Sequence, residues 1–424
     1  MAAQLLLTDK LPLRRASDLP GYRADVADKL LPWVFGRATL SPVPIDLVGQ
    51  DWIVADHPIV SIERVTIAGK KTEGWQLAQR LDATGHPIAV LRLAQPTTKE
   101  AVTATVVGRR HPQTGAALTT PGPIVREIMR LCGRVQDVDA WAGLDAAYGT
   151  LELGLVFDAQ VTLREALAAV VEPLGAMWRP GWAEPRALGE PVAVLDARSV
   201  ETISARVEAS GMATVARVTY LQDWAASAAR GAQEIAAPDA VERWGDLPVD
   251  MALPGVRRAK DALAIASARL ADMARVPWVV TATVDASRVG VLVAGQTVQL
   301  AHPHAPTGPA LLTSVVSDRE AGQYNLTASM HTASAPRVEL RRRHTAVDAA
   351  EGGTTGVTYR DGVATFTVYD DSGLPLAGAA VTFDGLYTAN TDAEGRVQFR
   401  AERGAHTLTV RMPGYADFEM DVVV

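Results

Sequence analysis

Apolar residues recur every three or four positions between residues 256 and 273, a spacing that places them on one face of a helix. These positions are Val256, Ala259, Leu263, Ala266, Leu270 and Met273. Charged side chains occupy the opposite face: Arg257, Arg258, Lys260, Asp261, Arg269 and Asp272. The pattern predicts an amphipathic helix over residues 255–275 that packs against other protein.

The apolar period changes to two after Pro277. Trp278, Val280, Ala282 and Val284 alternate with Val279, Thr281 and Thr283, as in a strand with two different faces. Short apolar runs broken by Gly, Pro and polar turns continue to Met330, and similar runs fill the first hundred or so residues. The two regions predict two small β-barrel domains, residues 1–115 and 213–335.

Two further helices have clear start and stop signals. In TTPGPIVREIMRLCG, Thr120 is placed to cap, Pro121 suits the first turn and Gly133 ends the helix. The second helix opens at Thr162 with Glu165 three residues later, a capping box, and ends at Gly175. Trp178 and Trp182 then flank a Pro-Gly turn between short strands. We expect an α/β insertion domain over residues 116–212.

Three segments are expected to differ from these domains. The Ala-, Gly- and Asp-rich stretch between Leu221 and Pro254 predicts a long surface loop. Residues 336–359 are rich in Arg, Thr and Gly and predict a linker. Residues 360–424 contain short strands at regular spacing, the pattern of an immunoglobulin-like β-sandwich. The predicted fold class is therefore multidomain and mainly β, with an α/β insertion.

Composition supports a folded protein with several cores. The length of 424 residues indicates three or four domains. The 48% share of hydrophobic residues, with 21% charged residues, is typical of a folded protein. The net charge is −7, and residues 361–424 hold ten acids against four Arg. No basic groove is evident, so tight or sequence-specific nucleic-acid binding is not expected.

Two apolar segments of the chain could be mistaken for a signal peptide or a membrane span, and neither fits such a segment. The apolar run in MAAQLLLTDK is too short for a signal peptide, so we expect a protein kept in the cytoplasm until assembly. Residues 289–317 lack charged residues, yet three prolines and two histidines there favour two strands joined by a loop.

No pattern of catalytic residues is found, so we expect no enzyme activity, no cofactor and no metal. The chain lacks a G-x-S-x-G elbow, an H-E-x-x-H motif and a glycine-rich phosphate loop. The single cysteine, Cys132, falls on an apolar helix face and is expected to be a packed thiol. His302 and His304 are interpreted as loop histidines. The acids Asp370, Asp371, Asp392 and Glu394 are interpreted as turn residues, with a calcium site as the alternative.

Two groups of residues are candidates for contacts with partners. Several of the nine tryptophans adjoin turns, and aromatic residues carry much of the binding energy at interfaces. The interface candidates are Trp33, Trp178, Trp182, Trp224 and Trp278, with core packing as the alternative. In the last module, Tyr387 and Asn390 are candidates for contact with a host surface glycan.

The order of elements resembles that of tailed-phage baseplate hub proteins over about residues 20–332. The phrases that carry the resemblance are LPWVFGR, TPGPIVREIMRLCG, TLREALAAVVEPLGAMWRPG, ARVTYLQDW, GQTVQLAHP and LLTSVVSDREAGQYNLTASM. The resemblance implies two β-barrels per chain in a homotrimer whose six barrels form a ring at the tail tip. Implied partners are the distal tail or tail tube protein, the tape measure protein and a central fibre or spike. Genome DNA would pass through the ring.

The last module separately resembles carboxypeptidase-regulatory-like, immunoglobulin-like modules. The resemblance rests on DDSGLPLAGAAVTFDG, TANTDAEGRVQF and GAHTLTVRMPGY. It implies a fold and no catalytic residue.

Together these patterns predict a structural hub in the virion, present in the host cytoplasm during assembly and acting in DNA ejection and host attachment. Two alternatives belong to other classes. One is a virion adhesin that binds host sugar through the last module, and the other is a virion-associated cell-wall lysin.

Overall fold

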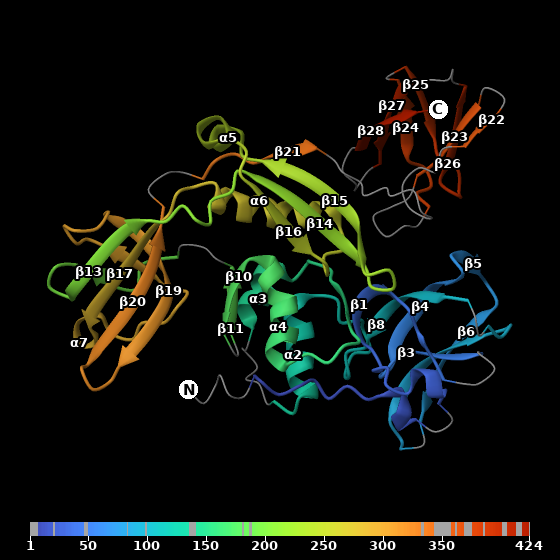
Figure 1. The fold of residues 1–424 in the computed structure, drawn as a ribbon, viewed down its shortest axis with the longest axis horizontal. Coiled ribbons are helices and arrows are strands. Elements are labelled where there is room, and N and C mark those ends of the chain that lie inside the picture. Colours follow the sequence, from blue (N-terminus) through green and yellow to red (C-terminus); the bar gives the residue numbers. More distant parts are fainter. Residues whose placement is uncertain are drawn as a thin grey trace.

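The computed structural model contains several separate hydrophobic cores (Figure 1). The structure describes residues 7–19, 22–45, 50–82, 84–97, 100–134, 141–179, 182–185, 189–331, 335–342, 358–360, 363–368, 375–384, 386–400, 405–412 and 418–423. Among these, two β-barrels lie at opposite ends of the long axis, with a mixed α/β unit between them (Figure 1).

The first barrel consists of two sheets that enclose one core. One sheet contains β1 (Trp33–Leu40), β8 (Val102–Arg109), β4 (Ile59–Ile67) and β5 (Lys70–Thr72). The other contains β2 (Val43–Pro44), β3 (Asp51–Ala55), β7 (Pro87–Leu93) and β6 (Trp75–Leu81). Alternate side chains point inward, as in β8, where every second residue is buried. The short helices η1 (Ala16–Asp18) and η2 (Ala24–Val26) contribute to a smaller core against the second sheet.

The second barrel is a single curved sheet of six strands. Their order is β12 (Val194–Leu195), β18 (Thr297–Leu300), β19 (Gly308–Asp318), β20 (Gln323–Met330), β17 (Trp278–Asp285) and β13 (Val200–Val207). The helix α7 (Ala286–Val289) follows β17. The period of two predicted for residues 278–284 is confirmed, because Val280, Ala282 and Val284 are buried in this core.

The central unit packs helices against strands that continue the first barrel's sheet. Its strands are β9 (Gly154–Phe157), β14 (Val215–Asp223), β15 (Ala228–Ala236), β16 (Pro248–Leu253) and β21 (Glu339–Arg342). Its helices are α2 (Pro121–Leu131), α3 (Ala142–Tyr148), α4 (Leu163–Val171), η3 (Glu172–Leu174), α5 (Pro238–Trp244) and α6 (Ala259–Met273), and a hairpin of β10 (Ala176–Arg179) and β11 (Trp182–Pro185) adjoins them. The α6 face predicted from the sequence packs in the same core as α2 and α4. The structure therefore places β14–β16 and α6 with the central unit, and places β12 and β13 in the second barrel.

Strand β1 joins the first barrel to the central unit. Val34 lies in the barrel core, whereas its neighbours Trp33 and Phe35 lie in the central core. The backbone of β1 approaches that of residue 153 so closely at position 36 that only glycine fits there. A Cβ at Gly36 would lie 1.8 Å from the Leu153 carbonyl oxygen, and Gly36 has a φ of 60°. This crossing fixes the two units to each other.

The three predicted helices are confirmed as α2, α4 and α6. Thr162 and Glu165 form the predicted capping box of α4. Pro121 begins α2, but the Thr120 side chain makes no capping hydrogen bond, so this part of the prediction is wrong. The loop predicted between Leu221 and Pro254 is also wrong, because that segment forms β15, α5 and β16. The reason is tertiary pairing with β14, which overrides the weak local pattern.

The predicted linker, residues 336–359, contains strand residues in the structure at 339–342 and at 358–359. Glu339–Arg342 forms β21, which pairs with β15. Arg341, which lies in the predicted linker, donates to the Asp246 carboxylate at 2.8 Å. The polar composition of this segment concealed an edge strand, since edge strands tolerate charged residues.

The last module is a β-sandwich, as predicted. One sheet contains β22 (Thr358–Arg360), β23 (Val363–Thr367) and β26 (Arg396–Arg400). The other contains β25 (Tyr387–Asn390), β24 (Ala380–Phe383), β27 (Ala405–Arg411) and β28 (Phe418–Val423). Three phenylalanines fill its core, with the rings of Phe383 and Phe399 stacked at 5.3 Å and Phe366 beside both. The aromatic cluster gives this module a core independent of the rest of the chain.

Candidate functional site

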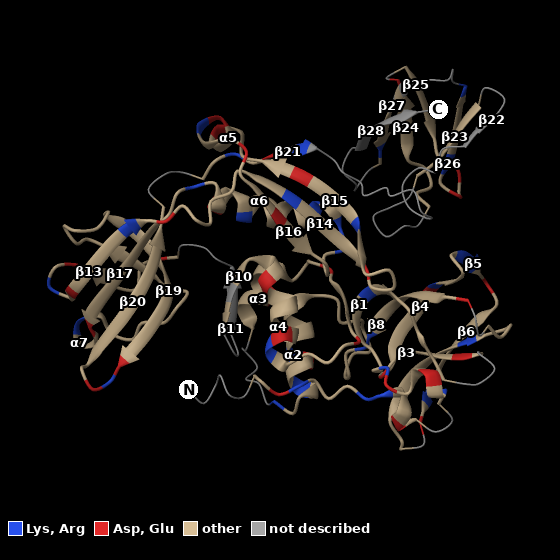
Figure 2. Ribbon diagram, viewed as in Figure 1, with Lys and Arg blue, Asp and Glu red and all other residues tan. Residues whose placement is uncertain are grey.

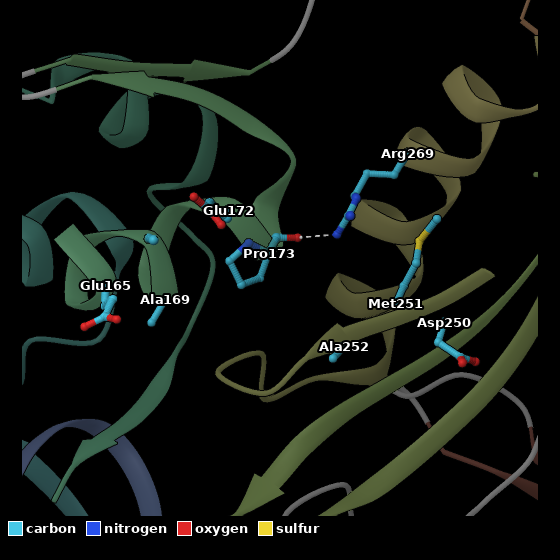
Figure 3. Close-up of a pocket in the computed structure, with 9 residues that line it drawn as sticks. Glu165, Ala169, Glu172, Pro173, Asp250, Met251, Ala252 and Arg269 are labelled. Atoms are coloured by element: carbon cyan, nitrogen blue, oxygen red, sulfur yellow. Dashed lines mark hydrogen bonds between the residues drawn. The ribbon is translucent and has the colours of Figure 1, made fainter. Parts of the chain in front are cut away.

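An open pocket lies between the α4 layer and the α6 layer of the central unit (Figure 3). Its volume is about 420 Å³, and it is lined by Glu165, Ala168, Ala169, Glu172, Pro173, Asp250, Met251, Ala252 and Arg269. Arg269 reaches across it from α6 and donates to the Pro173 carbonyl oxygen at 3.2 Å (Figure 3). Burial lowers the pKa of Arg269 from its usual value.

The carboxylates of this pocket are not arranged as a catalytic pair. Glu165 accepts hydrogen bonds from the Thr162 backbone and hydroxyl, because it forms the capping box of α4. Glu165 and Asp250 lie on opposite sides of the Arg269–Pro173 contact (Figure 3). The pocket therefore contributes a polar contact between two helical layers, and we assign it no reaction.

A buried charge cluster attaches the N-terminal segment to the first barrel. The Arg14 Nε donates to both Asp56 carboxylate oxygens at 3.0 and 3.1 Å, and its Nη1 lies 2.5 Å from Asp82 Oδ2. The Asp82 pKa lies well below its usual value: burial acts to raise it, but hydrogen bonds from Arg14, Thr84 and the His86 backbone outweigh burial. Burial raises the pKa of Asp56 despite its bond to Arg14. The cluster is a structural clamp, because each charged group has a partner.

His57 lies beside this cluster and is fully buried in the first barrel. Its Nε2 accepts a hydrogen bond from the Val34 backbone N–H at 3.0 Å, and its Nδ1 lies 3.0 Å from the Pro58 carbonyl oxygen. Burial, followed by the nearby charge of Arg109, lowers the pKa of His57 to about 3. The neutral ring thus satisfies a backbone group of β1 at the junction of the two units.

His57 predicts a specific loss of stability in acid. Below about pH 6.5 the unfolded chain protonates this histidine, while the folded chain keeps it neutral down to about pH 3. Stability therefore falls by roughly 1.4 kcal/mol per pH unit through this window. Urea unfolding at several pH values measures the slope, with the variant His57→Gln as control. The slope of the variant should be shallower by about this amount, and equal slopes would contradict the assignment.

The five candidate tryptophans differ in their availability to a partner. Trp33 is only 4% exposed and packs in the central core, so the expectation of an interface anchor is wrong for this residue. Trp178, Trp224 and Trp278 are half-buried against the chain's own cores. The Trp224 indole N–H donates to the Gly154 carbonyl oxygen at 3.3 Å, which holds it at the β1 crossing. The side chain of Trp182 lies outside the described residues.

The remaining sequence candidates occupy ordinary structural positions. Cys132 is half-buried after α2, and burial raises its thiol pKa. The rings of His302 and His304 lie 5.4 Å apart, and no group of three possible metal ligands occurs among the residues that the structure describes. Asp392 accepts hydrogen bonds from the backbone N–H groups of Glu394 and Arg396, the pattern of a turn acid. Asp370 and Asp371 lie outside the described residues.

Tyr387 and Asn390 do not form one contact surface. Both lie on β25, an outer strand of its sheet, but residues three apart on a strand point to opposite faces. Tyr387 is 62% exposed and its neighbour Leu386 is 77% exposed. Among the described residues of this module, Leu386 and Tyr387 are the large apolar side chains that are exposed, and of these two the sequence indicated only Tyr387.

The described helices include none that is long and apolar enough to cross a membrane. Figure 2 shows acidic and basic residues interspersed over the described strands and helices.

Comparisons with known proteins give two separate results. Residues 365–424 match the family described as the carboxypeptidase regulatory-like domain. A chain from the virion of a native gene transfer agent particle superposes with a TM-score of 0.55 at 18% identity, covering 73% of this chain and 88% of that chain. No curated protein matches the chain.

Other solved structures align over similar lengths with lower scores. A tail protein from Neisseria meningitidis MC58 aligns at 13% identity and a TM-score of 0.36, covering 71% of this chain and 96% of its own. The 43 kDa tail protein of prophage MuSo2 from Shewanella oneidensis aligns at 11% identity and a TM-score of 0.36, covering 72% and 98%. The chain is thus similar in fold to a component of a gene transfer agent virion, and it carries a C-terminal segment that matches the carboxypeptidase regulatory-like domain.

Proposed function

We propose that this chain is a structural protein of a virion tail, the hub at the tail tip, and that three copies form a ring. The observation that supports the proposal best is the fold shared with a gene transfer agent virion chain over 73% of this sequence. The ring would continue the tail tube and surround the DNA channel.

The mechanism that we infer is geometric. Each copy presents two barrels at opposite ends of its long axis (Figure 1). Three copies would place six barrels in one ring, matching a sixfold tube on one side and a threefold tip on the other. The glycine crossing at Gly36 fixes the first barrel to the central unit, so these two units would enter the ring as one body.

The proposed partners follow from this position. The distal tail or tail tube protein would contact the ring from above, and a central fibre or spike from below, with the tape measure protein inside the tail. Genome DNA would pass through without specific binding, because charges of both signs are interspersed and the net charge is −7. Assembly would take place in the host cytoplasm.

The inferred role is structural and not catalytic. In the pocket of the central unit, Glu165 caps α4, Arg269 joins the two layers and Glu172 accepts a hydrogen bond from the Trp178 indole at 3.4 Å. Binding of other proteins is the function that this arrangement of cores and barrels supports.

An adhesin function of the last module is a second candidate. The exposed pair Leu386–Tyr387 favours it, since exposed aromatic residues are common at binding surfaces. Deletion of residues 360–424 separates the two functions. If virions with the deleted chain assemble but no longer bind host cells, the adhesin function is supported. If these virions bind host cells as before, the adhesin function is contradicted.

The mass of the purified chain in solution tests the ring. Because the proposed ring is a closed assembly of three copies, light scattering should give about three times the chain mass of 45.0 kDa. A monomer at every concentration up to the solubility limit would contradict the proposed ring.

A further inference from the structure

The outer edge of β13 is an open strand edge at one end of the molecule. β13 is the last strand of the second barrel's sheet and pairs with β17 alone among the described strands. In Figure 1 it lies at the end of the long axis that is farthest from the first barrel. An open edge presents unpaired backbone groups to any strand that can approach.

The register identifies which backbone groups are free. Glu208 N–H donates to the Pro277 carbonyl oxygen, and the pairs from Thr202↔Thr283 to Val207↔Trp278 continue in the same register. Hydrogen-bonded pairs alternate along an antiparallel ladder, so Thr202, Ser204 and Arg206 bond to β17. The N–H and C=O groups of Ile203, Ala205 and Val207 consequently point away from the sheet.

The segment from Thr202 to Val207 keeps a regular register with β17 and carries one charged residue, Arg206, because the register shift of β13 and Glu201 lie before it. It contains no proline, and Val207 at its end is 51% exposed. The strand β5 at the opposite end of the molecule is different, because it is only three residues long and carries exposed Lys70 and Lys71. Short, lysine-bearing edges resist pairing with copies of themselves.

The charges at the two ends are complementary. Glu201 lies in β13 and Glu208 follows it, and Arg206 is ion-paired with Glu208 at 3.4 Å, so these three residues leave one net negative charge at this edge. Lys70, Lys71 and Glu73 give the β5 end an excess of positive charge, and blue positions mark β5 in Figure 2. Opposite charge across an interface favours the correct encounter and disfavours like-with-like contact.

We propose that the β13 edge binds the β5 end of the first barrel in a second copy of this chain. A contact of β13 with β13 would be two-fold and would stop at two copies, whereas a head-to-tail contact between opposite ends closes a ring. The inference rests on the proposed three-copy ring and adds its interface. Each first barrel then adjoins a second barrel of the next copy.

Hydrogen exchange in the assembled chain tests the interface at single amides. The amides of Ile203, Ala205 and Val207 should exchange at least ~10-fold more slowly in the oligomer than in dilute monomer. The amides of Ser204 and Arg206 bond to β17 in both states and serve as internal controls. If the three outward amides are equally protected in the monomer, or remain unprotected in an oligomer, the proposal is wrong.

Variants test the same contact through association. Val207→Lys should weaken self-association on the order of tenfold or more by placing charge at the edge. Val291→Lys, at an 81% exposed position of the same barrel, should leave it unchanged. Ala205→Pro provides a second block, because its amide has no partner in β17 and proline there removes no ladder bond.

Charge-reversing substitutions test whether the β5 end is the surface that binds the β13 edge. Lys70→Glu with Lys71→Glu should weaken association, and adding Glu201→Lys and Glu208→Lys should restore it in part. If the lysine variants associate normally while Val207→Lys does not, another surface binds β13 and the assignment of the β5 end fails. If the unmodified chain remains monomeric, the proposed ring itself fails.

Discussion

Gly36→Ala is expected to prevent stable folding of the first barrel on the central unit. The added Cβ would lie 1.8 Å from the Leu153 carbonyl oxygen and 2.9 Å from its carbon, and both are backbone atoms of the adjoining strand region. Neither can move without breaking the β1–β9 pairing. The backbone of Gly36 also has a φ of 60°, which disfavours a side chain. We expect a loss of more than about 4 kcal/mol in the free energy of unfolding.

Gly85→Ala is the matched control for this substitution. Gly85 has a φ of 82°, but a Cβ there would meet no atom within 4 Å. The control isolates backbone strain, which costs roughly 1–2 kcal/mol. Urea unfolding followed by tryptophan fluorescence compares the two variants. Similar losses for both would contradict the claim that contact at the β1 crossing dominates.

Glu127→Ala is the second substitution with a large expected effect. Glu127 is 5% exposed on α2 and pairs with Arg109 Nε at 2.5 Å and Arg130 Nε at 2.7 Å. Burial acts to raise the Glu127 pKa, but the hydrogen bonds and charges of the two arginines hold it below its usual value. Removing the carboxylate leaves Arg109 buried without this partner, so we expect a loss of about 3–5 kcal/mol.

The neighbouring residue on the same helix supplies the control for Glu127→Ala. Arg126 pairs with Asp145 at 2.7 Å, but both side chains are partly exposed. Arg126→Ala should therefore cost less than about 1 kcal/mol in the free energy of unfolding. Chemical denaturation of both variants at neutral pH gives the comparison. A cost for Glu127→Ala as small as that of its neighbour would show that the buried pair contributes little.

Elements with strong local signals were predictable from the sequence. The capping box of Thr162 and Glu165 identified α4, and the change of period after Pro277 identified β17. In the last module, turn residues at regular spacing identified the sandwich. Each of these signals depends on residues close in sequence, which is why tertiary context did not override them.

Elements that depend on distant partners were not predictable. β15 consists largely of Ala, Gly and polar residues and shows no apolar alternation. Its small residues are required by packing, since a Cβ at Gly231 would lie 2.4 Å from the Tyr220 ring on β14. β21 likewise reads as a polar linker until β15 is present to pair with it.

The candidate site residues show a similar division. Aromatic residues beside turns pack in cores as readily as at interfaces, so the sequence did not distinguish buried Trp33 from an interface anchor. The free edge of β13 depends on which strand neighbours are present, and strand order is not encoded in local spacing. An exposed Val at position 207 is a weak signal alone and becomes informative only with the sheet order.

The proposed place in the virion is tested most directly by electron microscopy of purified virions labelled with antibody against residues 360–424. A structural hub predicts label on the tail tip of every intact particle, and averaging of the unlabelled tip should show three copies around a central channel. Label on the capsid, or virions that lack the chain altogether, would contradict the proposal.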